Sequence, residues 1–168
     1  MLQRRAEFGC RRTRVLHRLV RRWRAIPIED FDSHRLDWTP TGTAFSTSDR
    51  KSPGQGFIYG QSERFASSYS PVDGDAAVGE WLSSPFTVTG EAITFQLGGG
   101  QSSRVRVELV HDGKVVRRSW GCKSEIMGRR IWNVESLQGK DVRLRLIDAS
   151  TKSWGHLLVD TITQWRRR

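Results

Sequence analysis

Apolar and charged residues alternate at positions 105–109, and this pattern constrains the fold more than any other in the chain. An Asp-Gly pair at 112–113 follows it, and the segment 114–117 then resumes with two valines. Asp-Gly between two such segments is typical of a tight β-hairpin. The same period of two recurs at 93–97 and at 142–146, where apolar side chains would share one face and polar side chains the other. The centre of the protein is therefore predicted to be an antiparallel sheet that is buried on one face.

Short strand-like segments separated by turn residues continue through the rest of the chain. Further strands are predicted at residues 26–32, 38–45, 65–69, 77–82, 86–88, 131–134 and 154–162. Residues 46–56, rich in Ser, Asp, Lys, Pro and Gly, are predicted as a loop, and residues 135–140 as a compact turn. Eight or more short strands with this punctuation indicate an all-β fold, an antiparallel β-sandwich or a barrel.

Basic residues are concentrated at the two ends of the chain. Of its 168 residues, 28 are Lys or Arg and 18 are Asp or Glu, which is a formal net charge of +10. Residues 1–25 and 166–168 hold 12 of the basic residues and one acidic residue, which leaves a formal charge of −1 for residues 26–165. We therefore expect an Arg-rich N-terminal arm at 1–25, one folded body at 26–165 and a basic tail at 166–168. The near-neutral body is not expected to bind nucleic acid.

The N-terminal arm carries a narrow apolar stripe. Leu16, Leu19, Val20 and Trp23 fall at positions i, i+3, i+4 and i+7 of a helix in a strongly cationic segment. A short helix of this kind can touch nucleic acid or an anionic membrane surface. The alternative is a disordered leader, because isolated helices of this length are marginally stable. Arginines interrupt any apolar core that a secretory signal would need, and no apolar run approaches the length of about 20 residues that crosses a membrane, so neither segment is predicted.

The chain has two cysteines, Cys10 and Cys122. Neither has a C-x-x-C partner, and the two lie in unrelated segments. They are expected to be free thiols rather than parts of a metal site or of a disulfide framework.

Several short motifs follow one another through the body of the chain. They are Phe95-Gln96-Leu97-Gly98-Gly99-Gly100, Val107-Glu108-Leu109-Val110, Asp112-Gly113-Lys114-Val115-Val116-Arg117, Ser124-Glu125-x-Met127, Trp132-x-Val134, Leu137-x-Gly139-Lys140, Ile147-Asp148 and Trp154-Gly155-His156-x-x-Val159-Asp160-x-Ile162. In this order they resemble the bacterial β-sandwich module that accompanies family 32 glycoside hydrolases, the levanase and invertase-like enzymes, and some other secreted proteins. The resemblance covers residues 28–162 and departs from the family at residues 152–153, where a second glycine is expected before the Trp. It implies a galactose-binding-like jelly roll and an extracellular or periplasmic location.

Glycoside hydrolysis needs two carboxyl groups on opposite sides of the bond that is cleaved. The Asn-Asp-Pro, Arg-Asp-Pro and Glu-Cys signatures that family 32 uses do not occur in this sequence. The resemblance therefore implies a non-catalytic accessory module, or a fragment of a family 32 hydrolase of fructan or sucrose without its catalytic domain. No catalytic residue is expected.

Aromatic side chains supply the candidate sugar-binding residues. The chain has seven Trp, and an aromatic ring can stack on the apolar face of a sugar while polar neighbours hold the sugar hydroxyls. Trp154 and His156 are the first candidates, followed by Trp120 and Tyr59. Each ring can instead fill the core or brace a loop, and His156 can hydrogen-bond a loop carbonyl in place of a sugar hydroxyl. Asp148 is expected to orient the Trp154 loop through an Asx-type turn.

Acidic residues lie at both ends of the predicted body. Glu29, Asp30 and Asp32 lie on its first strand and Asp160 on its last, and in a jelly roll these strands commonly run side by side. Oxygen ligands that meet there suit Ca²⁺, an ion that galactose-binding-like modules often carry. A structural calcium ion is one expectation; solvated charges and a salt bridge to an Arg are the alternative.

These features predict a non-catalytic carbohydrate-binding or interaction module, accessory to a glycoside hydrolase-type system. Fructan is among its candidate ligands, and a catalytic domain or a partner protein is its candidate neighbour. The alternatives are a hydrolase fragment, a binder of nucleic acid or anionic surfaces through the N-terminal arm, and a purely structural sandwich between domains. Binding through the arm would weaken steeply with salt, whereas stacking on a neutral sugar would not.

Overall fold

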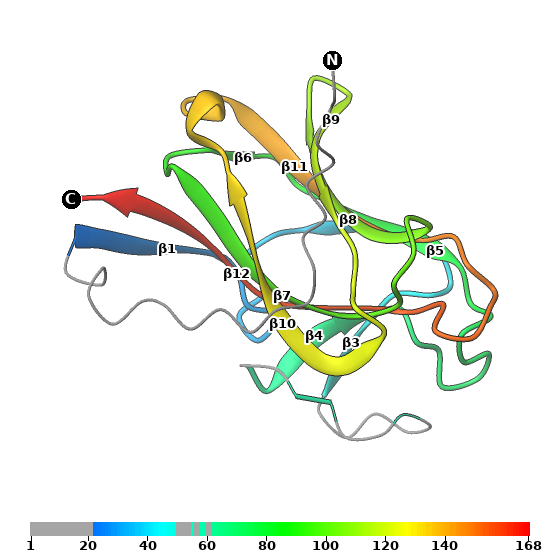
Figure 1. Ribbon diagram of the computed structural model, residues 1–168. Helices are drawn as coiled ribbons and strands as arrows, with labels where there is room; N and C mark the ends of the chain where they lie inside the picture. Colours follow the sequence, from blue (N-terminus) through cyan, green and yellow to red (C-terminus); the bar gives the residue numbers. More distant parts are fainter. Residues whose placement is uncertain (1–21, 50–54, 56–57, 60–61) are drawn as a thin grey trace, which may run out of the picture.

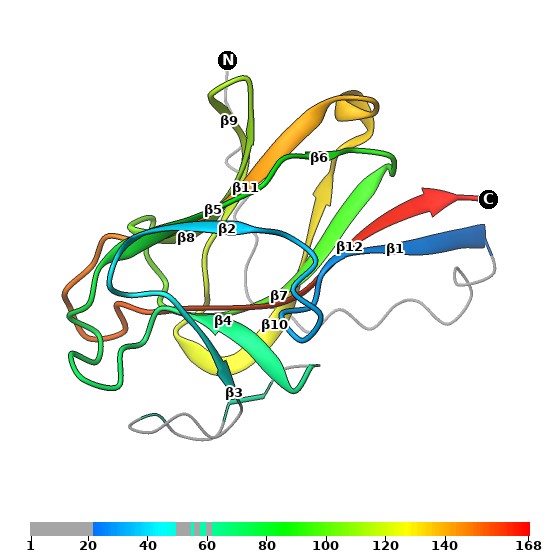
Figure 2. The same cartoon turned by 180° about the vertical axis from the view of Figure 1, so that it is seen from behind.

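A computed structural model describes residues 22–49, 55, 58–59 and 62–168 of the chain. Within these ranges the strands form two sheets that enclose a common core (Figure 1; seen from behind in Figure 2). Every strand pair in the two sheets is antiparallel. The prediction of an all-β antiparallel sandwich is confirmed.

The first sheet has β7 and β12 near its centre. Its strands follow the order β10, β7, β12, β4 and β3, and β1 also pairs with β12. The bounds are β1 (Trp23–Glu29), β3 (Ser46–Asp49), β4 (Arg64–Ser67), β7 (Ala92–Gly99), β10 (Ser124–Asn133) and β12 (Leu157–Arg167). The first and last strands lie side by side, as expected for a jelly roll, with Ile26 opposite Gln164 (Figure 1).

The second sheet follows the order β2, β5, β11, β8 and β9, and the short strand β6 also pairs with β11. The bounds are β2 (Trp38–Gly42), β5 (Gly79–Ser83), β6 (Phe86–Thr87), β8 (Val105–His111), β9 (Lys114–Ser119) and β11 (Asp141–Asp148). The predicted hairpin is formed by β8 and β9, and its turn residues Asp112 and Gly113 have φ angles of 48° and 73°, which suit a tight turn.

A short 3-10 helix, η2 (Glu135–Leu137), precedes β11 and coincides with the predicted compact turn. Leu137 is its buried residue and joins the core. No helix in the part of the chain that the structure describes is long and apolar enough to cross a membrane.

The core lies between the two sheets and follows from the alternation in the sequence. Val105, Val107 and Leu109 of β8 point into it and have 0% exposed surface. Phe95 and Trp132 of the facing sheet pack edge to face there, with ring centroids 4.6 Å apart. Each fully buried side chain of this size stabilises the fold by about 1.5–3 kcal/mol relative to an exposed one.

A smaller apolar cluster covers the other face of the first sheet. It consists of Ile58, Phe65, Met127 and Leu158. Leu158 alternates along β12 with residues that face the main core, so its side chain points to the opposite face. The cluster attaches the segment around residue 58 to β10 and β12.

The ends of the first and last strands differ from the prediction. β1 begins at Trp23 and ends at Glu29, and Phe31, predicted to continue the strand, leaves it with a φ of 59°. β12 continues to Arg167, which pairs with Trp23. Both strands thus extend beyond the body predicted at 26–165, and Trp23 lies in a strand rather than in a helix. Residues 1–21 of the predicted arm, and with them most of its predicted helix, lie outside the described residues.

β3 occupies the beginning of the segment that was predicted as a loop. Among the described strands it lies at the edge of its sheet and pairs only with β4, with Ser46 opposite Ser67. Its sequence has no apolar alternation, so the pairing with β4 defines it as a strand and local sequence does not.

Cys122 lies in the segment between β9 and β10. Its sulfur accepts a hydrogen bond from Nη2 of Arg130, at 2.9 Å. Cys122 is disulfide-bonded, so the expectation of a free thiol there is wrong. Cys10 lies outside the described residues.

Candidate functional site

Trp154 and His156 lie together in the connection between β11 and β12, the orange segment of Figure 1. Their rings stack, with centroids 5.7 Å apart and an angle of 26° between the planes. The backbone around them is tightly packed: Trp154 has a φ of 60°, and a Cβ atom added to Gly155 would lie 2.5 Å from the carbonyl oxygen of Lys152. This packing holds the indole against the imidazole.

His156 is buried between two carboxylates. Its Nδ1 lies 2.6 Å from Oδ1 of Asp75 and its Nε2 lies 3.3 Å from Oε1 of Glu125. Burial by itself would lower the pKa of His156, but the carboxylates of Glu125 and Asp75 outweigh it and raise that pKa above its ordinary value. His156 has only 3% of its surface exposed, and its side chain pairs with carboxylates rather than with a loop carbonyl. In this position His156 supports the Trp154 indole from its buried side.

Asp75 connects the imidazole to the backbone of the Trp154 loop. Its Oδ2 accepts the backbone N–H of Trp154 at 2.8 Å, while Oδ1 faces His156. Tyr69 adds an edge-on contact to the imidazole, with ring centroids 5.7 Å apart. Asp75 and Tyr69 come from the connection between β4 and β5, so two connecting segments meet at one histidine.

Asp148 forms the Asx-type turn that was expected of it. Its Oδ1 accepts the backbone N–H of Ser150 at 3.1 Å. Its Oδ2 accepts the hydroxyl of Ser68 at 2.7 Å, and that hydroxyl oxygen accepts the N–H of Leu157 at 2.7 Å. Burial raises the pKa of Asp148 to about 6. The end of β11 and the start of β12 are thus tied together beneath the Trp154 loop.

An open hollow of about 430 Å³ lies beside Trp154. Its cationic lining residues are Arg104, Lys123 and Lys152. Small hydroxyl side chains line much of the rest, namely Ser102, Ser150, Thr151 and Ser153. Trp154 therefore lines a polar hollow while its indole stacks on a buried ring, an arrangement that suits stacking on a sugar.

Trp120 and Tyr59, the other two candidates, do not line this hollow. They are exposed, with 40% and 56% of their surfaces accessible. Tyr59 lies beside β10, where its N–H donates to the carbonyl oxygen of Glu125 at 3.2 Å. Of the four candidate ligand-binding residues, Trp154 alone lines the hollow, with His156 behind it.

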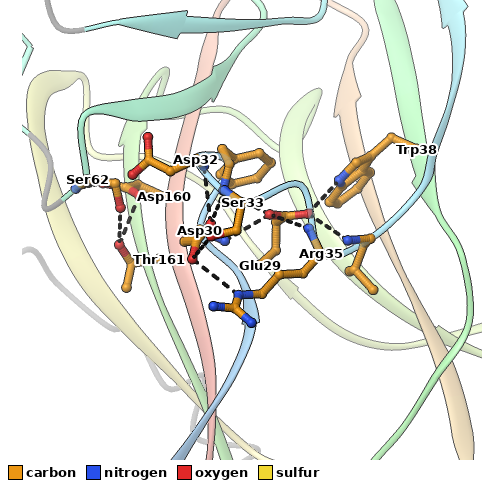
Figure 3. A network of polar contacts seen from close by, with 11 residues as sticks. Glu29, Asp30, Asp32, Ser33, Arg35, Trp38, Ser62, Asp160 and Thr161 are labelled. Carbon is orange, nitrogen blue, oxygen red and sulfur yellow. Dashed lines mark hydrogen bonds and ion pairs between the residues drawn. The ribbon is translucent and has the colours of Figure 1, made fainter.

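The acidic residues expected to hold calcium are used by the backbone instead (Figure 3). Both carboxylate oxygens of Glu29 accept N–H groups. Oε1 accepts those of Asp30, Phe31 and Arg35, at 2.9, 2.8 and 3.3 Å, and Oε2 accepts the backbone N–H of Leu36 and the indole N–H of Trp38, at 3.0 and 3.2 Å. A carboxylate surrounded by donors in this way folds the segment after β1 around itself and does not fit a cation.

The other three carboxylates have separate partners. Asp30 accepts from Ser33 and Arg35, and these contacts lower its pKa although burial would raise it. Asp32 accepts the N–H of Arg64 at 2.9 Å, and Asp160 accepts the N–H of Ser62 at 2.9 Å. Among the described residues no group of three or more His, Cys, Asp or Glu could hold a metal ion. The four side chains therefore do not form a shared ligand set for the expected calcium.

Asp75 and Glu125, the two carboxylates around His156, were not singled out by the sequence. Asp75 lies in a turn, and Glu125 belongs to the Ser124-Glu125-x-Met127 motif, whose sequence suggests no partner for His156. Asp75 is 81 residues from His156 in the chain. No local pattern connects such distant positions, so only the pairing of strands could bring them together.

No protein-family model matches the chain. A curated relative is ecdE of Aspergillus rugulosus, provisionally named a glycosyl hydrolase, which is 32% identical over 142 residues, or 80% of this chain. The chain spans only 20% of the length of that relative.

Solved structures share the fold at low sequence identity. TmCBM61, a carbohydrate-binding module solved with beta-1,4-galactotriose, has a TM-score of 0.55 and 9% identity, covering 85% of this chain and 97% of that one. A cyclase from Fischerella sp. TAU has a TM-score of 0.52 and 15% identity, covering 86% and 98%. The K3 adhesin domain of Lys-gingipain from Porphyromonas gingivalis w83 has a TM-score of 0.50 and 12% identity, covering 86% and 99%. These likenesses show that the chain has the β-sandwich fold found in carbohydrate-binding modules, and they show the fold alone.

Proposed function

We propose that this chain is a non-catalytic carbohydrate-binding module, accessory to a glycoside hydrolase. The observation that carries the proposal is the position of Trp154, which lines a polar hollow of about 430 Å³ and whose indole stacks on the buried ring of His156. An indole offers a large apolar surface at little cost in side-chain freedom, and one that is already fixed loses even less on binding. The hydroxyl side chains of the hollow would hydrogen-bond the sugar that stacks on the ring.

The comparisons support this proposal in two ways. The sandwich fold is shared with TmCBM61, and the sequence is related to one part of ecdE, whose provisional name is glycosyl hydrolase. Since the chain spans 20% of ecdE, the related part is small enough to be an accessory module. In the proposal, catalysis belongs to another domain or to a partner protein. The resemblance to the module of family 32 hydrolases adds levan and inulin to the candidate ligands.

Affinity electrophoresis tests the proposal. The full chain would be run through native gels that contain levan, inulin, galactan or acidic polysaccharides, and we expect at least one of them to retard it. Trp154→Ala should weaken this retardation by about tenfold or more. Trp120→Ala removes an exposed indole outside the hollow and should leave retardation intact. Circular dichroism checks that both variants are folded. Absence of retardation in every gel would contradict the proposal, and retained binding by Trp154→Ala would place the site elsewhere.

Hydrolysis is the second candidate function, favoured by the name of ecdE. It is tested by incubating the chain with sucrose, inulin or levan and measuring released fructose. Release of fructose at a rate above that of a heat-denatured sample would overturn the non-catalytic role.

A further inference from the structure

The hollow at Trp154 is lined by cations. Arg104, Lys123 and Lys152 contribute positive charge, and the other lining residues are neutral. Within the described ranges none of the three forms an ion pair with a carboxylate. A ligand in the hollow would therefore meet uncompensated positive charge.

Two carboxylates that support the Trp154 loop already have partners. Asp75 accepts from Trp154 and pairs with His156. Asp148 has 2% exposed surface and accepts from Ser68 and from a backbone N–H. These groups lie behind the Trp154 loop and hold it in place, so they do not supply the counter-charge that the cations lack.

The fold brings the cations together from three separate segments. Arg104 precedes β8 and is oriented by its Nε, which donates to the carbonyl oxygen of Ala149 at 2.9 Å. Lys123 precedes β10, where its backbone N–H donates to the carbonyl oxygen of Gly99 at 2.8 Å. Lys152 follows β11. The concentration of charge is thus a property of the folded surface and not of one basic run in the sequence.

Positive charge continues from the hollow onto the second sheet. Arg106 donates from Nη1 to the carbonyl oxygen of Ser103, in the turn that carries Arg104. Arg106 and Arg145 share the one carboxylate of Glu108, with N–O distances of 2.6 and 2.5 Å. Two guanidinium groups on one carboxylate leave a net positive charge, so a polymer longer than one sugar would find further cations beside the hollow.

We propose that the hollow binds an acidic oligosaccharide, a glycan that carries carboxylate or sulfate groups. One sugar ring stacks on Trp154, and the acidic groups pair with Arg104, Lys123 and Lys152. This inference rests on the proposed carbohydrate-binding function and names its ligand class. It favours acidic polymers over neutral fructans, since a neutral ligand would leave the three cations unpaired in the complex.

Titration of the full chain with four polymers tests the inference: polygalacturonate for carboxylates, dextran sulfate for sulfates, levan as a neutral glycan and a single-stranded oligonucleotide as an anion that is not a glycan. The test variant is Lys123→Gln with Lys152→Gln. The matched control is Lys114→Gln with Lys140→Gln, which removes two exposed lysines outside the hollow and changes the total charge equally. We expect one acidic glycan to bind, the test variant to bind it about tenfold more weakly, the control to differ by less than about twofold, and Trp154→Ala to weaken it as well. Which of the two acidic polymers binds more tightly identifies the acidic group.

Each other outcome overturns the inference in a distinguishable way. If levan binds and the test variant retains its affinity, the carbohydrate-binding function stands and the acidic ligand class falls. If the test and control variants lose affinity equally, or if the oligonucleotide binds as tightly and ignores Trp154→Ala, the chain binds polyanions without a glycan site. If no glycan binds, acidic or neutral, the proposed function falls too.

Discussion

Nδ1 of His156 lies 2.6 Å from Oδ1 of Asp75, although 81 residues separate them in the chain. The other oxygen of Asp75 accepts the backbone N–H of Trp154 at 2.8 Å. One carboxylate thus fixes both the imidazole and the loop whose indole stacks on it. The candidate sugar platform is held by a buried imidazole and a partly buried carboxylate that do not line the hollow, which is how a binding surface is made rigid before its ligand arrives.

Asp75→Asn should lower the pKa of His156, because it removes one of the two negative charges that raise it against the effect of burial. It should also destabilise the fold by about 2 kcal/mol, since it leaves a buried imidazolium with one carboxylate. NMR titration of the His156 ring protons and urea unfolding measure the two effects. Asp112→Asn is the matched control, because Asp112 pairs with His111 at 3.3 Å while its side chain is 84% exposed. An Asp75→Asn variant with an unchanged His156 pKa would contradict the assignment.

The stability of the fold should depend on the ionisation of Asp148. Its pKa is raised by burial from 3.8 to about 6, so the folded state binds a proton more tightly than the unfolded state. Its contribution is greatest below about pH 4 and is lost as the pH rises through about 6, a change of about 3 kcal/mol. Asp148→Asn cannot titrate, so its stability relative to the native chain should rise by that amount between pH 4 and pH 7.5 in urea unfolding. A difference that stays constant over this range would show that Asp148 has the same pKa in the folded and unfolded states and would contradict the raised pKa.

The titration of His156 also lowers the stability of the fold as the pH rises, and it does so at higher pH than the titration of Asp148. Its pKa is raised above the ordinary value, so the stability it supplies is complete below about pH 6.5 and is lost as the pH rises through the folded value. The Asp75→Asn variant should lose less unfolding free energy than the native chain between pH 6.5 and pH 9. Unfolding curves of equal pH dependence for both proteins would contradict this.

Glu29→Gln should destabilise the fold by about 3 kcal/mol. A glutamine amide presents one acceptor oxygen in place of two, so the donors that face its nitrogen lose their acceptor. Glu63→Gln, at an exposed position, is the control and should have little effect.

The thermal midpoint of the native chain should be the same in saturating calcium and in excess chelator, because the carboxylates of this region accept N–H donors. A midpoint that rises with calcium would restore the expected ion.

Gly100→Ala should disturb the Trp154 loop far more than Gly113→Ala disturbs the β8–β9 turn. A Cβ atom on Gly100 would lie 2.1 Å from the carbonyl oxygen of Trp154, so backbone must move. At Gly113 nothing lies within 4 Å of a Cβ atom, and only its φ of 73° resists substitution. We expect losses of about 3 kcal/mol or more and about 1 kcal/mol in unfolding experiments. Equal losses would mean that the loop adapts without cost.

The sandwich was predictable because its signals are local. Alternation along β8 and β11 and the Asp-Gly turn at 112–113 each depend on neighbours in the chain, and each is confirmed by burial and register. β3 was missed because its four residues carry no such signal and depend on pairing with β4. The same applies to the two ends of the body, where Trp23 and Arg167 form a strand pair that neither end of the sequence reveals.

The sequence by itself determined the central strands with their alternating pattern, the Asp-Gly turn at 112–113, the Asx turn at Asp148 and Trp154 as a candidate aromatic residue, since each of these follows from residue type and short-range spacing. Only the tertiary structure decided what the charged groups do. It buries His156 between Asp75 and Glu125, directs N–H groups onto Glu29, and gathers Arg104, Lys123 and Lys152 around Trp154. The reason is physical: the state and role of a charge depend on its burial and on its partners in space, and in a sheet sandwich those partners come from strands far apart in the chain.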